Sequence, residues 1–203
     1  MQAITETAGR ALAAGTALTL IILIAWLALV GADALGFFSF LLRWVHVVAA
    51  MLWVGMIWFV NFVQLAAVQQ ADDAGRRTLM SAVVPKVAHA FRHASHLTVV
   101  SGALLLVTTG YVFGSLVFST AVFVPTPRAL MMLVGTIGGI VMWAFVHFVI
   151  WPNLRIVLGE SPAEPAAREH ARETVKTYAR LNLVLTLPVT FAMVAAAHLL
   201  IRE

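Results

Sequence analysis

Five stretches of mainly apolar residues, separated by short polar segments, dominate the sequence. They cover residues 11–30, 44–65, 97–118, 129–151 and 181–201. A hydrocarbon core of about 30 Å needs about 20 helical residues, because each residue of an α-helix adds about 1.5 Å. The pattern therefore predicts five transmembrane helices.

The polar segments between these helices differ in length. Residues 69–77 read QQADDAGRR, and residues 152–180 form the longest polar segment. The second half of that long segment, from Ala166, mixes charges of both signs, which is typical of an exposed helix. The sequence shows no internal repeat, so we expect one transmembrane domain over residues 1–203.

Composition supports a membrane protein and excludes several other classes. Of the 203 residues, 62% are hydrophobic and 11% are charged, whereas a soluble domain has about 25% charged residues. We therefore expect an all-α integral membrane protein in contact with the lipid bilayer. The sequence has no cysteine, which excludes thiolate metal sites, iron–sulfur clusters and covalently attached c-type haem.

The basic residues lie in the segments between the apolar stretches and predict an orientation. Ten lysine and arginine residues fall on the side of the N-terminus, and three fall on the other side: Arg43, Arg128 and Arg202. Because cytoplasmic loops carry the excess of lysine and arginine, we expect a bacterial inner-membrane protein with a cytoplasmic N-terminus and a periplasmic C-terminus. The net charge of +4 is thus explained by topology, and we expect no nucleic-acid partner.

Four histidines fall near the ends of the predicted helices. With this orientation, His46 and His198 lie near the outer ends of the second and fifth helices. His96 and His147 lie near the inner ends of the third and fourth helices. The two levels are expected to be about 20 Å apart.

This pattern is typical of a four-helix cofactor-binding bundle formed by the second to fifth helices. Haem iron accepts imidazole nitrogens on its two faces, and the core of a helix bundle is where such cofactors bind. The pattern therefore predicts two haems b, ligated by His46 with His198 and by His96 with His147. One haem is the first alternative. The second is no haem, since a histidine near a helix end also reaches the interface or bonds a backbone carbonyl.

Other side chains of the spans have two interpretations each. Arg43 and Arg92 are candidates to pair with haem propionates, or they anchor helix ends at the interface. Trp53 either flanks a haem or belongs to the apolar core. Asn61 and Gln64 are interpreted as hydrogen-bond formers between helices, and no cluster of polar residues in the spans is shaped for a purine.

The third helix leaves a choice of inner ligand. His96 lies three residues after His93, about 4.5 Å deeper along the helix, and matches the depth of His147 better. We therefore expect His96 to be the ligand. His89 and His93 are spaced for a separate metal site, although an interfacial cluster of protonatable side chains is the preferred interpretation.

One motif resembles a known family. The stretch RWVHVVAAMLWVGMIWFVNFVQ, residues 43–64, contains His46-x6-Trp53-x-Gly55. It resembles the N-terminal membrane domain of the bacterial cytochrome-c-type urate oxidase (urate hydroxylase) family. A similar pattern occurs, more distantly, in the copper-resistance D and HemJ-type membrane families.

The resemblance implies a membrane redox protein, with haem in the wider group. The sequence has no Cys-x2-Cys-His, so we expect electrons to leave through a separate c-type cytochrome or another redox subunit. The leading hypothesis is a b-type cytochrome that carries electrons, alone or as a subunit of a redox complex. One alternative is a membrane oxidase of urate or a porphyrinogen-like substrate. Another is a non-redox structural subunit or oligomer.

Overall fold

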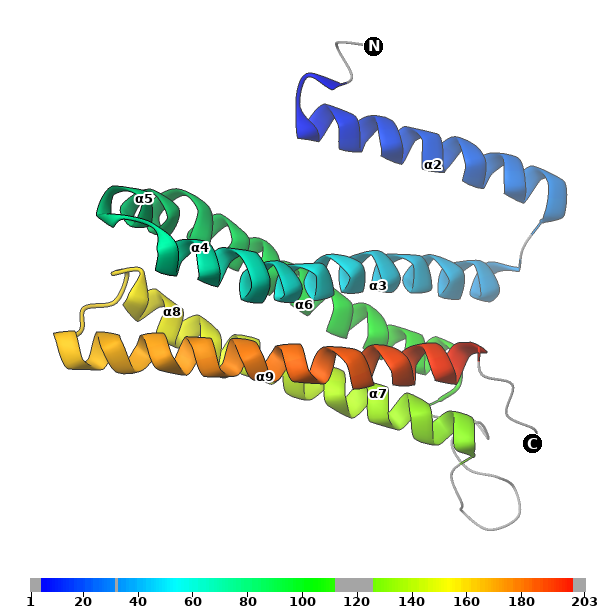
Figure 1. Ribbon diagram of the computed structural model, residues 1–203. Coiled ribbons are helices and arrows are strands. Elements are labelled where there is room, and N and C mark those ends of the chain that lie inside the picture. The colour runs from blue at the N-terminus through cyan, green and yellow to red at the C-terminus, as the bar shows by residue number, and fades with distance from the viewer. Residues whose placement is uncertain (1–4, 32, 112–125, 199–203) are drawn as a thin grey trace. The chain divides into compact units, whose positions relative to one another are not determined.

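The computed structural model describes residues 5–31, 33–111 and 126–198, and these are almost entirely helical (Figure 1). Five helical rods are long and apolar enough to cross a membrane: Ala8–Val30, Ala34–Gln70, Asp73–Thr108, Pro127–Val157 and Pro165–His198. The chain is accordingly an all-α, multi-pass membrane protein. It divides into two compact units, one up to Phe40 and one from Leu41 onward.

The first unit contains α2, Ala8–Val30, and the beginning of α3. The side chain of Thr7 caps α2 by accepting a hydrogen bond from the backbone N–H of Arg10, which satisfies one of the unpaired donors of the first turn. Gly31 ends the helix with φ 72°, a left-handed conformation that glycine adopts without strain. No residue of α2 is buried.

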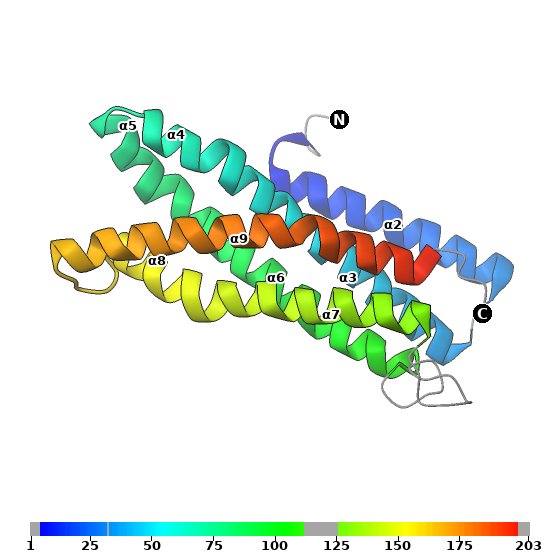
Figure 2. The ribbon, with the colours of Figure 1, turned by 60° about the horizontal axis from the view of Figure 1, so that its bottom comes forward.

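The second unit is a bundle of four rods, three of which contain a short π-helical turn. The rods are, in order, α3 (Ala34–Phe59), η1 (Val60–Gln64) and α4 (Leu65–Gln70); α5 (Asp73–Thr78), η2 (Leu79–Val83) and α6 (Val84–Thr108); α7 (Pro127–Ala144), η3 (Phe145–Ile150) and α8 (Trp151–Val157); and α9 (Pro165–His198). Figure 2 shows α9 running beside α7 along the length of the bundle. At Gly135 of α7, an added Cβ would lie 3.0 Å from the Met193 side chain of α9, so glycine permits the close approach of these two helices.

Proline follows two of the three π-helical turns at the same distance. Pro85 comes two residues after η2, and Pro152 comes two residues after η3. Proline has no N–H to donate and its ring collides with the carbonyl four residues earlier. A π-turn before the proline accommodates the carbonyl that loses its partner.

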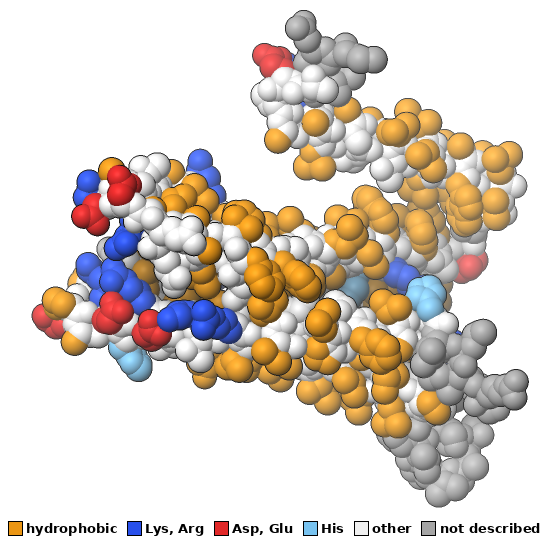
Figure 3. Space-filling view, viewed as in Figure 1, with side chains coloured by type: hydrophobic (Ala, Val, Ile, Leu, Met, Phe, Trp, Pro, Cys, Tyr) orange, Lys and Arg blue, Asp and Glu red, His pale blue; other side chains and the backbone are white. Residues whose placement is uncertain are grey.

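The core of this bundle is small, and the outer surface is apolar. Trp53, Ile57, Ala94, Met142 and Val146 form the buried cluster. Many large apolar side chains are exposed instead, and they are spread along the visible flank of the bundle (Figure 3). Charged side chains gather at the end formed by α4, α5 and the beginning of α9. An apolar flank with charge at one end is the surface expected of a helical bundle in a bilayer.

The observed helices correct several predicted bounds. The third predicted helix, 97–118, instead begins at Asp73 and ends at Thr108, where Gly110 turns the chain with φ 80°; residues 112–118 lie outside the described residues. The fifth, 181–201, and the exposed helix predicted from Ala166 are one continuous helix, α9, described as far as His198. Hydropathy detects the part of a helix that lies in lipid, and these helices extend beyond it.

Candidate functional site

Two of the predicted ligands, His96 and His147, lie against each other. His96 belongs to α6 and His147 to η3, and their ring centroids are 5.1 Å apart. The Trp143 Nε1–H donates to His96 Nδ1 at 3.3 Å, and His147 Nε2 lies 3.2 Å from the Ser95 hydroxyl. The π-turn η3 rotates the chain before α8 and includes His147, as π-turns at functional sites commonly do.

His46 is held by the backbone of α6. Its Nδ1 lies 2.8 Å from the Thr98 carbonyl oxygen and 3.3 Å from the Ser101 hydroxyl. A carbonyl only accepts, so Nδ1 carries the proton, and in the neutral ring Nε2 keeps its lone pair. Metal-binding histidines are commonly oriented by such a bond from the other ring nitrogen to a backbone carbonyl.

Gly102 leaves the space that this ring occupies. A Cβ added at Gly102 would lie 2.9 Å from His46 Cε1 and 3.1 Å from Nδ1. Only glycine therefore leaves the imidazole in place, and α3 approaches α6 closely at this point.

The depth predicted for His46 relative to His96 is wrong. On α6, the Thr98 and Gly102 positions that contact His46 lie two and six residues after His96, about 3 to 9 Å along the axis rather than about 20 Å. The hairpin between α4 and α5 explains the difference. His46 lies 24 residues before Gln70 and His96 lies 23 residues after Asp73, so both are nearly equally far from the turn.

The structure does not join the predicted outer pair. His198 is exposed at the described end of α9. No hydrogen bond or ring contact links it to His46 among residues 5–31, 33–111 and 126–198. His46 is half-buried and its described polar contacts are to α6.

The remaining predicted side chains have other surroundings. Arg43 is exposed, and the Arg92 guanidinium carbon lies 4.6 Å from the centroid of the Trp151 ring, a cation–π contact. Trp53 is 3% exposed within the apolar core, and its Nε1–H has no partner in the structure. His93 is exposed and stacks with His89 at 6.5 Å between centroids.

The histidines differ in how well they fit a haem. Metal–imidazole bonds are about 2 Å long, so two imidazoles on opposite faces of one iron place their ring centres about 6 Å apart. The His96 and His147 ring centroids are 5.1 Å apart and the rings are tilted by 59°, so they lie about 1 Å closer than this spacing. His46 has the orientation common among metal-binding histidines, because Nδ1 bonds the Thr98 carbonyl and Nε2 keeps its lone pair. In the described part of the chain, no group of three or more His, Cys, Asp or Glu side chains could hold a bare metal ion.

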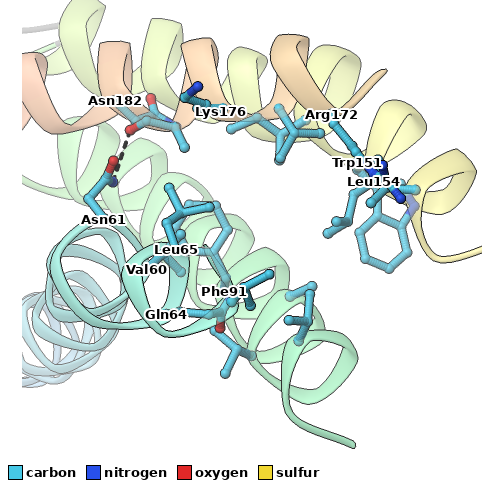
Figure 4. Close-up of a pocket in the computed structure, with 18 of the residues that line it drawn as sticks. Val60, Asn61, Gln64, Leu65, Phe91, Trp151, Leu154, Arg172, Lys176 and Asn182 are labelled. Atoms are coloured by element: carbon cyan, nitrogen blue, oxygen red, sulfur yellow. Dashed lines mark hydrogen bonds between the residues drawn. The ribbon is translucent and has the colours of Figure 1, made fainter. Parts of the chain in front are cut away.

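The sequence did not predict a cavity that lies near the charged end of the bundle. Asn61, Gln64 and Asn182 line it, together with Arg92 and Arg172 (Figure 4). Each amide comes from an apolar run, and no spacing in the sequence connects Asn182 of α9 with Asn61 and Gln64 of η1. These three amides lie together in the structure, whereas the sequence indicated no cluster of polar residues shaped for a purine.

Comparison with known proteins gives one match. Residues 110–201 resemble the family described as urate oxidase N-terminal. The predicted resemblance is thus confirmed for this part of the chain, although the matched residues do not include the His46 to Gly55 motif. No curated protein and no solved structure matches the chain.

Proposed function

We propose that this chain is a membrane-embedded redox protein that carries electrons from a urate-type substrate through one haem b. The resemblance of residues 110–201 to the urate oxidase N-terminal family supports the reaction class. The five apolar helices support the location in a membrane.

The single observation that carries the haem is the geometry of His46. The bond from Nδ1–H to the Thr98 carbonyl fixes the ring and its tautomer, and Nε2 is then the nitrogen that would bind iron. Arg43 lies three residues before His46 on α3, on the same side of the helix, where it would pair with a propionate. A single haem replaces the predicted two, because His46 and His96 lie at nearly the same level.

Haem supplies one-electron chemistry when bound, and the protein supplies the position. Thr98 and Ser101 hold the imidazole from α6. Gly102 keeps the ring close to the helix backbone.

We further propose the orientation and the partner. The end of the bundle at which charged side chains gather (Figure 3) would face the cytoplasm of a bacterial inner membrane. The matched family is described as an N-terminal part, which supports a separate c-type cytochrome or another redox subunit as the electron acceptor.

Purified full-length protein in detergent tests this proposal. Pyridine haemochrome analysis should approach one haem per chain, and the reduced-minus-oxidised spectrum should show a b-type α band. His46→Ala should lose the haem, whereas His170→Ala, at an exposed position of α9, should retain it. A haem content unchanged by His46→Ala, or no haem in protein from native membranes, would contradict the proposal.

A further inference from the structure

The cavity near the charged end of the bundle has walls that are largely apolar. Its volume is about 260 Å³, and its walls come from η1 and α4, from α6, from η3 and α8, and from α9, all within the second unit. Val60, Leu65 and Phe91 are among its apolar side chains (Figure 4). Arg172 and Asn182 of α9 both line it, so it extends for about 15 Å along this helix. A space of this length with apolar walls suits an alkyl chain.

The amides of the wall do not determine what binds in the cavity. Asn61 Nδ2 already donates to the Ile57 carbonyl at 2.9 Å and to the Ala179 carbonyl at 3.2 Å. The unpartnered polar atoms of Asn182 and Gln64 have almost no accessible surface, so a ligand in the cavity does not reach them. The chemistry of the ligand therefore depends on the apolar walls and on the charged side chains.

Those charged side chains leave one cation in excess. Arg92, Arg172 and Lys176 line the cavity together with Glu169 and Glu173. Arg172 pairs with Glu169 at 3.0 Å, and Lys176 pairs with Glu173 at 3.3 Å. Solvent reaches both pairs, and exposed ion pairs add little to stability. Arg172 and Lys176 are thus able to turn toward another anion.

Arg92 is the cation that has no carboxylate partner. No salt bridge joins it to Asp or Glu within the described residues. Its guanidinium carbon lies 4.6 Å from the centroid of the Trp151 ring, and Arg172 points toward the same tryptophan (Figure 4). A guanidinium stacked on an aromatic ring keeps its N–H groups for hydrogen bonds, and its planar fork matches the oxygens of a phosphate. The cavity therefore combines apolar walls with a site for one anionic group.

We infer that the cavity binds an anionic phospholipid, with the phosphate at Arg92 and Arg172 and an acyl chain along the apolar walls. Basic pockets between transmembrane helices on the cytoplasmic side bind anionic lipid head groups, and the proposed orientation puts this end of the bundle at the inner leaflet. A zwitterionic lipid would bring a second cation into a site that already has one in excess. The inference goes beyond the proposed electron transfer, because lipid binding requires neither haem nor an organic substrate.

Native mass spectrometry of purified full-length protein in detergent tests the inference. The probes are dioleoyl phosphatidylglycerol and dioleoyl phosphatidylcholine, added separately at equal concentrations. We expect one phosphatidylglycerol per chain to bind at least fivefold more tightly than phosphatidylcholine. An excess of glycerol 3-phosphate, which has the anionic group but no acyl chain, should not displace it.

Two kinds of substitution separate the charge from the cavity. Arg92→Gln should weaken phosphatidylglycerol binding about fivefold, the effect of one basic side chain near an anionic lipid, and Arg172→Gln should weaken it to a smaller extent. Arg77→Gln is the matched control, because Arg77 is exposed at the same end of the bundle and does not line the cavity. Ala88→Leu fills part of the cavity without changing charge and should weaken the binding of both lipids severalfold, whereas Ala74→Leu, at an exposed position of α5, should not.

Several results would overturn the inference. Equal binding of the two lipids would remove the role of the excess cation, and displacement by glycerol 3-phosphate would remove the role of the acyl chain. Folded Arg92→Gln and Arg172→Gln proteins that bind phosphatidylglycerol as tightly as Arg77→Gln would contradict the phosphate site. Binding that is weakened by Arg92→Gln but not by Ala88→Leu would place the lipid on the outer surface of the bundle instead of in the cavity.

Discussion

Replacing Asn182 with leucine should make the protein more stable. The Asn182 side chain is fully buried and its two polar atoms have no partner. A buried unsatisfied polar group costs about 1–3 kcal/mol. Leucine removes both polar atoms, and its larger side chain must fit into a packed site.

We expect a net gain of about 2 kcal/mol in the ligand-free protein, somewhat less than the summed penalty, because the fit of leucine is imperfect. For a chain of this size, 1 kcal/mol corresponds to about 2–4 °C in Tm, so Tm should rise by about 4–8 °C. Thermal unfolding in detergent, followed by circular dichroism, measures this shift. Asn61→Leu is the contrast, because it removes the bonds to Ala179 and Ile57 and should lower stability by about 1 kcal/mol.

A fall in Tm for ligand-free Asn182→Leu, equal to that for Asn61→Leu, would refute the reasoning. It would mean that the Asn182 amide already has its partners within the folded protein.

Other substitutions test the histidine geometry. Gly102→Ala should displace the His46 ring, since the new Cβ would lie 2.9 Å from it, and should reduce haem content severalfold. Gly139→Ala, with no atom within 4 Å of the new Cβ, should leave haem content unchanged. Equal haem content in both variants would contradict a role of Gly102 in positioning His46. His96→Ala removes the acceptor of a neighbouring indole N–H and should lower the free energy of unfolding in detergent by about 1 kcal/mol, whereas His93→Ala, at an exposed position, should change it by less than about 0.5 kcal/mol.

The sequence predicted the number and type of helices but not the levels of their side chains. Apolar runs are a direct consequence of lipid contact, so the five spans could be found from hydropathy. The level of His46 could not, because it depends on where the hairpin between α4 and α5 turns. The rod that carries His96 begins at Asp73, long before the apolar run that starts at residue 97, and counting from the start of that run misplaced His96 relative to His46.

The cavity could not be predicted for a different reason. Asn182 stands alone in an apolar stretch of α9, and a lone asparagine in a span is usually a hydrogen-bond former between helices. Its importance comes from neighbours on three other rods and from the absence of a partner in the described structure. Only the packed arrangement reveals such a combination.

The π-turns also affect how relatives of this chain should be aligned. A π-turn contains one residue more than the α-helical turn it replaces, so deleting that residue restores a regular helix and leaves both flanking segments in phase. Insertions and deletions of a single residue should therefore be tolerated at η1, η2 and η3, within spans where gaps are ordinarily penalised. An ungapped alignment would then pair Asn61, Gln64 or His147 with neighbours of their true counterparts. Where relatives differ in the length of these three turns, residues at the same point in the bundle would have different positions in their sequences.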